Sequence, residues 1–248
     1  MSKRVFYIKN PYETSKSKVI NDFFDDYKNP DFEDVSAFIT GGGDGTLINS
    51  IQQYKQYGKP FYGLNAGTVG FLMNNVELDR LIDIKKNPNA FNNSTEITFK
   101  CIKVLVKQGD IQHEFNAFNE VMIGGDMNAW VHFDINEEDD IIGKFSGGGV
   151  IISTPQGSTG INKNNSGTIL PLKENLWSIT GDKTNRKIRY VITPRTMNIS
   201  YTSRNEVKLW IDGAYAIIDN PTDIQISEGE DVTLIFDCIK EFIKKRRL

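Results

Sequence analysis

Four of the five residues from Gly41 to Gly45 are glycine, and the remaining one is Asp44. A short apolar run at residues 35–39 precedes this segment, and apolar residues at helical spacing follow it, at positions 47, 48, 51 and 54. This order predicts a strand, a tight turn and a helix. Glycines let a backbone approach a phosphate closely, and a helix N-terminus favours an anion. The segment therefore predicts a phosphate-binding turn in an α/β fold.

The carboxylate of Asp44 is unusual among phosphate-binding glycines, because it would repel the phosphates. It fits a ligand on the metal side, or a base for a hydroxyl that attacks a phosphate. The alternative is a plain strand-to-helix turn with Asp44 as a helix cap. Four glycines exceed what a turn needs, and a turn gives no structural reason for Asp44 at this place. We expect phosphate or ATP to bind at Gly41, Gly42, Gly43, Gly45 and Thr46.

Other phosphate-binding devices are absent from the sequence. No GxxxxGK[ST] segment occurs, which excludes a Walker A loop. The glycine run is also not a dinucleotide fingerprint, because Thr46 stands where the third glycine should be.

Two patterns divide the chain. Strands (residues 5–8, 35–39, 61–64) alternate with helices (after Thr14 and Ser15, after residue 46, and at 76–86) up to about residue 93. This alternation predicts a parallel, doubly wound sheet. Short strands then follow at the spacing of a β sandwich, from 97–107 and 111–123 to 223–226 and 232–236. We expect an α/β domain at residues 1–93 and a mostly β domain at 94–248, whose last strand or tail packs back on the first.

Composition narrows the function classes. The 248 residues carry a net charge of −3, which argues against a polybasic nucleic-acid binder. Two distant cysteines exclude a disulfide scaffold, and two histidines leave little material for Ser–His–Asp catalysis. No apolar run approaches the ~20 residues of a membrane span, and the N-terminal apolar run is too short for a signal peptide. We expect a cytoplasmic protein with neither nucleic acid nor membrane as partner.

A second motif, NAGTVGFL at residues 65–72, follows the third predicted strand. Open α/β sheets bind ligands at the carboxyl ends of their parallel strands. Phe71 could stack on a base there, or pack in the core of an ordinary loop.

Two more motifs lie in the second half. Asn119 and Glu120 stand in an apolar strand, where a carboxylate is costly to bury without a partner. Glu120 could accept from a ribose diol, or lie exposed on the outer sheet face. Residues 153–167 form a segment rich in hydroxyls and amides, which predicts a polar ligand, with a surface loop as the alternative.

In this order the four motifs resemble the NAD kinase family, whose pattern is GGDGT, NxGxxGFL, NE and STPxGST. Asp212 and Gly213 resemble the DG pair of the family's last β hairpins. The GGDGT loop alone also occurs in lipid kinases, but these follow it with a different loop.

The resemblance implies transfer of the γ-phosphoryl group of ATP to the 2′-hydroxyl of the adenosine ribose of NAD, giving NADP. The active site would lie in a cleft between the two domains, and Mg²⁺ would come with ATP. Asp44 matches the catalytic residue of the family. The resemblance also implies a homodimer or homotetramer. The positions expected to bind NAD are Asp44, Gly45, Phe71, Asn119, Glu120, Thr159 and Asn164.

This chain departs from the family near the acceptor. Residues 146–149 read SGGG where the family has RGDG, and Gly160-Ile161 replaces Ala-Tyr. We expect weaker NAD binding, which the double change Gly148→Asp and Ile161→Tyr should strengthen. Two other functions stay open: a non-catalytic NAD- or nucleotide-binding homologue, and a kinase of another small hydroxyl acceptor, similar to a lipid kinase.

Overall fold

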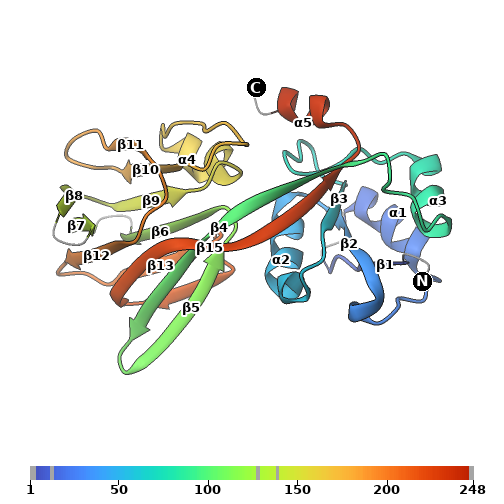
Figure 1. The fold of residues 1–248 in the computed structure, drawn as a ribbon. Coiled ribbons are helices and arrows are strands. Elements are labelled where there is room, and N and C mark those ends of the chain that lie inside the picture. The colour runs from blue at the N-terminus through green and yellow to red at the C-terminus, as the bar shows by residue number, and fades with distance from the viewer. Residues whose placement is uncertain (1–3, 12–13, 127–128, 138–139, 246–248) are drawn as a thin grey trace. The chain divides into compact units, whose positions relative to one another are not determined.

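The computed structural model, shown in Figure 1, describes residues 4–11, 14–126, 129–137 and 140–245. The chain forms two compact units, Met1–Phe99 with Val232–Leu248 and Lys100–Asp231. Strands β4 (Thr95–Gln108) and β15 (Thr222–Phe236) contribute residues to both units. The predicted division at residues 93 and 94 stays a prediction. No helix within the described ranges has the length and apolar character needed to cross a bilayer.

The first unit contains a parallel sheet. Its strands pair in chain order, as β1 (Arg4–Ile8), β2 (Val35–Gly42) and β3 (Phe61–Asn65). The end of β15 continues the sheet, because Leu234 pairs in parallel with Phe61. Buried apolar side chains such as Phe38 and Ile39 alternate to both faces of β2, as expected for a strand covered on both sides.

Helices cover both faces of this sheet (Figure 1), as α1 (Ser15–Phe24), α2 (Asp44–Tyr54) and α3 (Leu78–Lys86). A Cβ atom at Gly41 would lie 2.9 Å from Ile20 of α1, whereas one at Gly63 would lie 3.3 Å from Leu47 of α2. Gly41 pairs with Leu64, so Gly63 points to the opposite face. Helices α1 and α2 therefore lie on different faces, which confirms the doubly wound α/β prediction.

Helix α1 begins where the sequence predicts, and its buried face includes polar residues. Thr14 is the N-cap: its Oγ1 accepts from Ser17 N at 3.1 Å, and Ser17 Oγ accepts from Thr14 N at 2.7 Å. Ile20 and Phe24 are buried, whereas Val19 is 63% exposed. The buried stripe includes Ser17 and Asn21 instead.

The second unit is mostly β, as predicted. One antiparallel sheet has the order β11 (Arg189–Ile192), β10 (Trp177–Asp182), β9 (Gly149–Ser153), β6 (Glu120–Gly125), β13 (Val207–Ile211) and β14 (Ala216–Asp219). The other contains β8 (Asp140–Gly147), β7 (Val131–Glu137), β12 (Met197–Thr202), β15, β4 and β5 (Ile111–Ala117). One apolar core, including Phe133, Ile152 and Trp177, draws residues from both sheets.

Two strand predictions in this half need correction. The strands expected at 223–226 and 232–236 are one strand, β15. Gly229 is not a turn residue: a Cβ there would lie 2.8 Å from the backbone N of Lys103, so glycine permits a close strand approach. The strand expected at 111–123 is two, β5 and β6, separated at Phe118 and Asn119.

The last element that the structure describes is helix α5 (Ile239–Lys245). Its Phe242 is buried and stacks on Phe236, with ring centroids 4.2 Å apart. This contact lies within the first unit.

Candidate functional site

The glycine-rich turn consists of one residue between a strand and a helix. Strand β2 ends at Gly42 and α2 begins at Asp44, with Gly43 as an N-cap in extended conformation. No side chain caps this helix. The first N–H groups of a helix have no partner within it, and α2 begins two residues after the end of the buried strand β2. The turn therefore presents the anion-binding end of α2.

The four glycines serve two different needs. A Cβ at Gly41 would lie 2.9 Å from Ile20, and one at Gly42 would lie 2.6 Å from Cβ of Thr46, so packing requires glycine at both positions. At Gly43 and Gly45 a Cβ would meet nothing within 4 Å. Packing does not explain the last two glycines, and they leave open space where a phosphate could approach.

Asp44 has a structural role that the sequence did not predict. Its Oδ2 accepts a hydrogen bond from Phe71 N, and its Oδ1 accepts one from Leu72 N, both at 2.8 Å. The carboxylate thus fixes the second motif to the start of α2. The expectation that Asp44 had no structural reason to stand in the turn was wrong.

The second motif is shaped by its own asparagine. Asn65 Oδ1 accepts from Gly67 N at 3.0 Å, and its Nδ2 donates to Val69 O at 3.2 Å. Gly70 has a φ of 59°, and a Cβ there would lie 2.8 Å from the amide carbon of Asn65. Phe71 is half-buried. The structure therefore brings Asp44 and Phe71 together in the first unit.

Asn119 and Glu120 lie in the second unit, where Asp212 holds their backbone. The carboxylate of Asp212 accepts from the N–H groups of Phe118, Asn119 and Glu120 at 2.8, 2.7 and 3.2 Å. In return Asp212 N donates to Glu120 O at 3.0 Å. Asp212 and Gly213 have φ values of 47° and 70°, the left-handed conformation of a tight turn between β13 and β14.

Glu120 is buried, so its predicted alternative on an exposed sheet face is wrong. The residue is 8% exposed, and its Oε2 has no hydrogen-bond partner among the described residues. Burial, and to a smaller extent the charge of Asp212, raises the pKa of the Glu120 carboxyl to about 8. Asn119 Oδ1 is likewise buried without a partner. Two adjacent side chains thus keep polar atoms that a ligand could satisfy.

The fourth motif packs on the third. Thr154 Oγ1 donates to the carbonyl oxygens of Phe118 and Asn119, both at 2.9 Å. Gln156 Nε2 donates to Phe118 O at 2.6 Å. A Cβ at Gly157 would lie 2.7 Å from Asn119 Cα, so only glycine allows this approach.

The rest of that motif is not a flexible loop. It contains a short 3₁₀ helix, Gly157–Thr159, and helix α4, Ile161–Asn164. Asn162 is fully buried, and its Nδ2 donates to Ser158 O and Thr168 O. Thr159 is half-buried beside this scaffold and Asn164 is exposed. A Cβ at Gly160 would lie 3.9 Å from Glu120 Oε2, so the segment passes next to the buried carboxyl.

Sequence analysis placed three residues in motifs without predicting that they position other residues. Asp212, Thr154 and Gln156 hold the backbone of residues 118–120 from distant parts of the chain. A DG turn after an apolar strand gives a signal for the first. No local signal in the sequence distinguishes the other two from ordinary loop residues.

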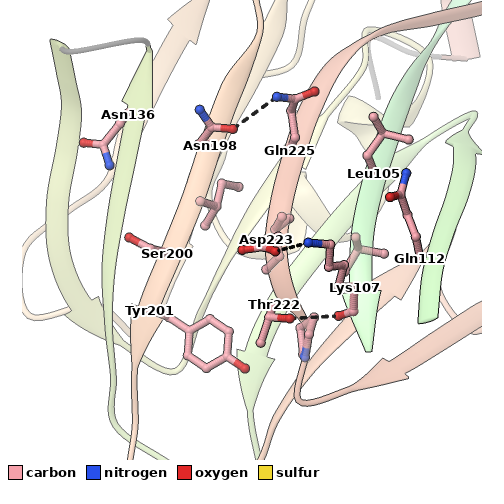
Figure 2. A pocket seen from close by; sticks show the side chains of 14 residues that line it. Leu105, Lys107, Gln112, Asn136, Asn198, Ser200, Tyr201, Thr222, Asp223 and Gln225 are labelled. Atoms are coloured by element: carbon pink, nitrogen blue, oxygen red, sulfur yellow. Dashed lines mark hydrogen bonds and ion pairs between the residues drawn. The ribbon is translucent and has the colours of Figure 1, made fainter. Parts of the chain in front are cut away.

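A groove in the second unit, shown in Figure 2, is lined by none of the predicted site residues. Its volume is about 700 Å³, and β4, β12 and β15 form its floor. Lys107 pairs with Asp223 at 2.7 Å, and Gln225 Nε2 donates to Asn198 Oδ1 at 3.3 Å. None of its described polar side chains has a buried nitrogen or oxygen without a hydrogen-bond partner, so the groove gives no sign of a missing ligand.

Among the described residues, His, Cys, Asp and Glu side chains do not gather in groups of three or more that could hold a metal ion. Mg²⁺ commonly binds through one or two carboxylates and the phosphates of a substrate. The carboxylate of Asp44, at the start of α2, fits that mode of binding.

Comparison with known proteins shows that the chain is similar to NAD kinases. Residues 118–235 match the family described as ATP-NAD kinase C-terminal domain. The NAD kinase of Rickettsia bellii (strain OSU 85-389) is 34% identical over 152 residues, 60% of this chain and 57% of that relative. The chain thus spans less than two thirds of that relative's length. The NAD kinase of Rickettsia rickettsii (strain Sheila Smith) is 26% identical over 212 residues, 83% of this chain and 81% of the relative.

Solved structures share the fold. A yeast NADH kinase in complex with NADH has a TM-score of 0.80 at 17% identity, over 99% of this chain and 86% of that one. An NAD kinase from Archaeoglobus fulgidus in complex with ATP has a TM-score of 0.72 at 19% identity, over 100% and 99% of the two chains. At these identities the likeness establishes the α/β and β-rich architecture.

Proposed function

We propose that the chain is a member of the NAD kinase family, to which it is similar, and that it transfers the γ-phosphoryl group of ATP to the 2′-hydroxyl of the adenosine ribose of NAD. The product is NADP. The observation that carries the proposal is the pair of buried, unpartnered oxygens on Asn119 and Glu120. Their backbone is fixed before any ligand binds, by the carboxylate of Asp212.

A ribose diol suits these two side chains. It offers hydroxyl donors, and Glu120 Oε2 and Asn119 Oδ1 are acceptors that burial leaves without a partner. With a pKa of about 8, the Glu120 carboxyl is largely protonated at neutral pH, so it can also donate to a hydroxyl or carbonyl oxygen. Binding would satisfy groups whose burial otherwise costs free energy.

Asp44 supports the chemical step. Its carboxylate is oriented by Phe71 N and Leu72 N, so it can accept the proton of an attacking hydroxyl without a conformational search. The open positions at Gly43 and Gly45 leave the N-terminal end of α2 accessible to the phosphates of ATP. Phe71, whose backbone N–H donates to Asp44, would lie near the adenine of NAD.

Mg²⁺ would be held by the phosphates of ATP and would neutralise the charge that develops during transfer. The homodimeric or homotetrameric assembly rests on the family resemblance, and the cytoplasmic location rests on the sequence. Thr159 and Asn164 complete the NAD-binding residues of this proposal.

The experiment is direct. Purified protein is incubated with ATP, Mg²⁺ and NAD, and NADP is measured with an NADP-specific dehydrogenase. Steady NADP formation that falls by orders of magnitude in Asp44→Asn supports the proposal. The matched control is Asp79→Asn, because Asp79 stands in the first turn of α3 as Asp44 stands in the first turn of α2.

Two results would favour other functions. NAD binding without NADP formation indicates a non-catalytic homologue, a reading motivated by the changed residues 146–149. ATP consumption only with another hydroxyl acceptor indicates a different kinase. Either result contradicts the proposal.

A further inference from the structure

A second cavity lies in the first unit, at the carboxyl ends of β1 and β2 and along α2 from Thr46 to Tyr54. Its volume is about 550 Å³, within the ~300–1,000 Å³ range of ligand pockets. None of the residues expected to bind NAD lines it, and among the predicted phosphate-binding residues only Thr46 does. Among the described residues of the lining, none is a carboxylate and one is a cation, Lys9. The cavity therefore adjoins the phosphate turn without overlapping the predicted acceptor residues.

Thr40 provides the sign of a missing ligand. It lines the cavity, is 1% exposed, and its Oγ1 has no hydrogen-bond partner among the described residues. Burying a hydroxyl without a partner costs free energy, and such groups are rare in folded proteins. Thr40 directly precedes Gly41, so its hydroxyl lies one residue from the phosphate turn.

Helix α2 turns a polar stripe to the same cavity. The stripe is spaced at i, i+3, i+4 and i+7, and consists of Thr46, Asn49, Ser50 and Gln53. Ser50 Oγ donates to Thr46 O at 2.9 Å. The amides of Asn49 and Gln53 are exposed, and amide side chains match the donor and acceptor edge of adenine.

An aromatic wall completes the cavity. Phe6 and Tyr54 both line it, and their ring centroids lie 6.0 Å apart. Both rings are half-buried, so part of each remains available. Stacking on such rings stabilises a planar nucleobase whichever polar groups the base carries.

We propose that this cavity binds the nucleoside of the phosphoryl donor. The base stacks against Phe6 and Tyr54, the hydroxyl of Thr40 bonds to the nucleoside, and the polyphosphate runs over Gly43 and Gly45. This inference rests on the proposed function and adds to it the residues that recognise ATP. A purine nucleoside is favoured over a carboxylate or sugar phosphate, because the described lining residues combine aromatic faces and amides with a single cation. That cation, Lys9, is itself paired with Asp25 at 3.2 Å.

Kinetics of two variants test the inference. Thr40→Val keeps the shape of the side chain and removes only the hydroxyl. Gln53→Ala removes an amide from the cavity, and Gln56→Ala is its matched control, exposed and one turn away but outside the lining. We expect the KM for ATP to rise about five-fold in the first two variants, while the KM for NAD and the control stay unchanged. An unchanged KM for ATP in Thr40→Val and Gln53→Ala would overturn the inference.

Binding without turnover separates this inference from the proposed function. ATP and inorganic tripolyphosphate are titrated calorimetrically into wild-type protein and Thr40→Val, with the unfolding midpoint as a check on folding. We expect Thr40→Val to weaken ATP about five-fold and leave tripolyphosphate unchanged. Equal weakening of both would show that the change acts through the phosphates, and would overturn the inference. Failure to form NADP would instead contradict the proposed function, and the ATP titration would still decide the cavity.

Discussion

The carboxylate of Asp212 accepts a hydrogen bond from the backbone N–H of Asn119 at 2.7 Å, across 93 residues of sequence. Its two oxygens also accept from Phe118 N and Glu120 N. One turn thus fixes the segment that carries the two buried, unpartnered side chains. A carboxylate with three N–H donors is a strong acceptor, because charge-assisted hydrogen bonds exceed neutral ones.

Asp212→Asn should therefore loosen this segment. Asparagine tolerates the φ of 47° found here, so backbone strain does not complicate the result. Its amide nitrogen cannot accept, which leaves at least one buried N–H without a partner. We expect a loss of about 1–3 kcal/mol in the free energy of unfolding, measured in urea. Asp219→Asn, exposed on β14, is the control and should change stability by less than about 0.5 kcal/mol.

Glu120 predicts a pH dependence of stability. Its carboxyl has an ordinary pKa of 4.5 and a folded-state pKa of about 8, raised first by burial and then by Asp212. Between these pH values the folded state keeps a proton that the unfolded state has released. The free energy of unfolding therefore falls as pH rises, by up to about 1.4 kcal/mol per pH unit. The favourable contribution is complete below pH 4.5 and lost above pH 8.

Glu120→Gln isolates this effect, because glutamine stays neutral at every pH. Urea unfolding of wild type and variant is compared from pH 5 to pH 8, so that contributions of all other groups cancel. Wild type should lose stability relative to the variant as pH rises. A difference that is constant across this range would contradict a raised pKa at Glu120.

Asp44→Asn should affect turnover in two ways. It removes the base, which is worth about 10²–10⁴-fold in rate. It also places an NH₂ group against Phe71 N or Leu72 N. This weakens the hydrogen bonds that hold the second motif to the start of α2. We expect a kcat loss of at least about 100-fold with a smaller rise in KM for NAD. If KM rises as steeply as kcat falls, Asp44 acts mainly by positioning Phe71.

Variants of the glycines in the turn distinguish a role in packing from a role in the approach of the ligand. Gly41→Ala should destabilise the fold by about 1–3 kcal/mol, since its Cβ would lie 2.9 Å from Ile20. Gly45→Ala has open space around it and should leave stability unchanged or slightly raised. It should nevertheless raise the KM for ATP about tenfold, because the methyl group occupies the approach of the phosphates. Unchanged ATP kinetics in a folded Gly45→Ala protein would remove Gly45 from the phosphate site.

The sequence predicted what local chemistry determines. The strand–turn–helix order at Gly41–Gly45, the α/β and β-rich halves and the capping of α1 at Thr14 all follow from local patterns. Contacts between distant segments were not predictable in this way. Gly229 lies in the middle of β15, where a loop between two strands was expected. Glycine is typical of turns, and only the position of the neighbouring strand shows that it permits a close approach here.

The same limit applies to the site. The sequence singled out Asp44, Asn119 and Glu120, but it could not show that Asp44 holds the loop of Phe71. It also left open whether Glu120 is exposed, since a strand's buried face depends on its partners. The roles of Gly45, Phe71, Thr159 and Asn164 stay predictions, and variants of these residues are the means to test them.

Gly148 gives a prediction that reverses an expectation drawn from the family pattern. A Cβ at Gly148 would lie 3.2 Å from Oδ2 of Asp182, on the neighbouring strand β10. The Asp of Gly148→Asp would then face an existing carboxylate, and like charges at such a separation repel by about 1 kcal/mol or more. The chain already carries a carboxylate at this place, supplied by Asp182. We therefore expect Gly148→Asp, alone or with Ile161→Tyr, to raise the KM for NAD.

Gly148→Asp combined with Asp182→Asn relieves this repulsion and should recover NAD binding to near the wild-type value. The KM for NAD and the urea midpoint of the single and double variants form a complete cycle, whose coupling term measures the interaction of the two positions. A Gly148→Asp protein that binds NAD more tightly than wild type, with no coupling to Asp182→Asn, would show that the two carboxylates do not share a place. In that case the aspartate of the family pattern is missing from this chain.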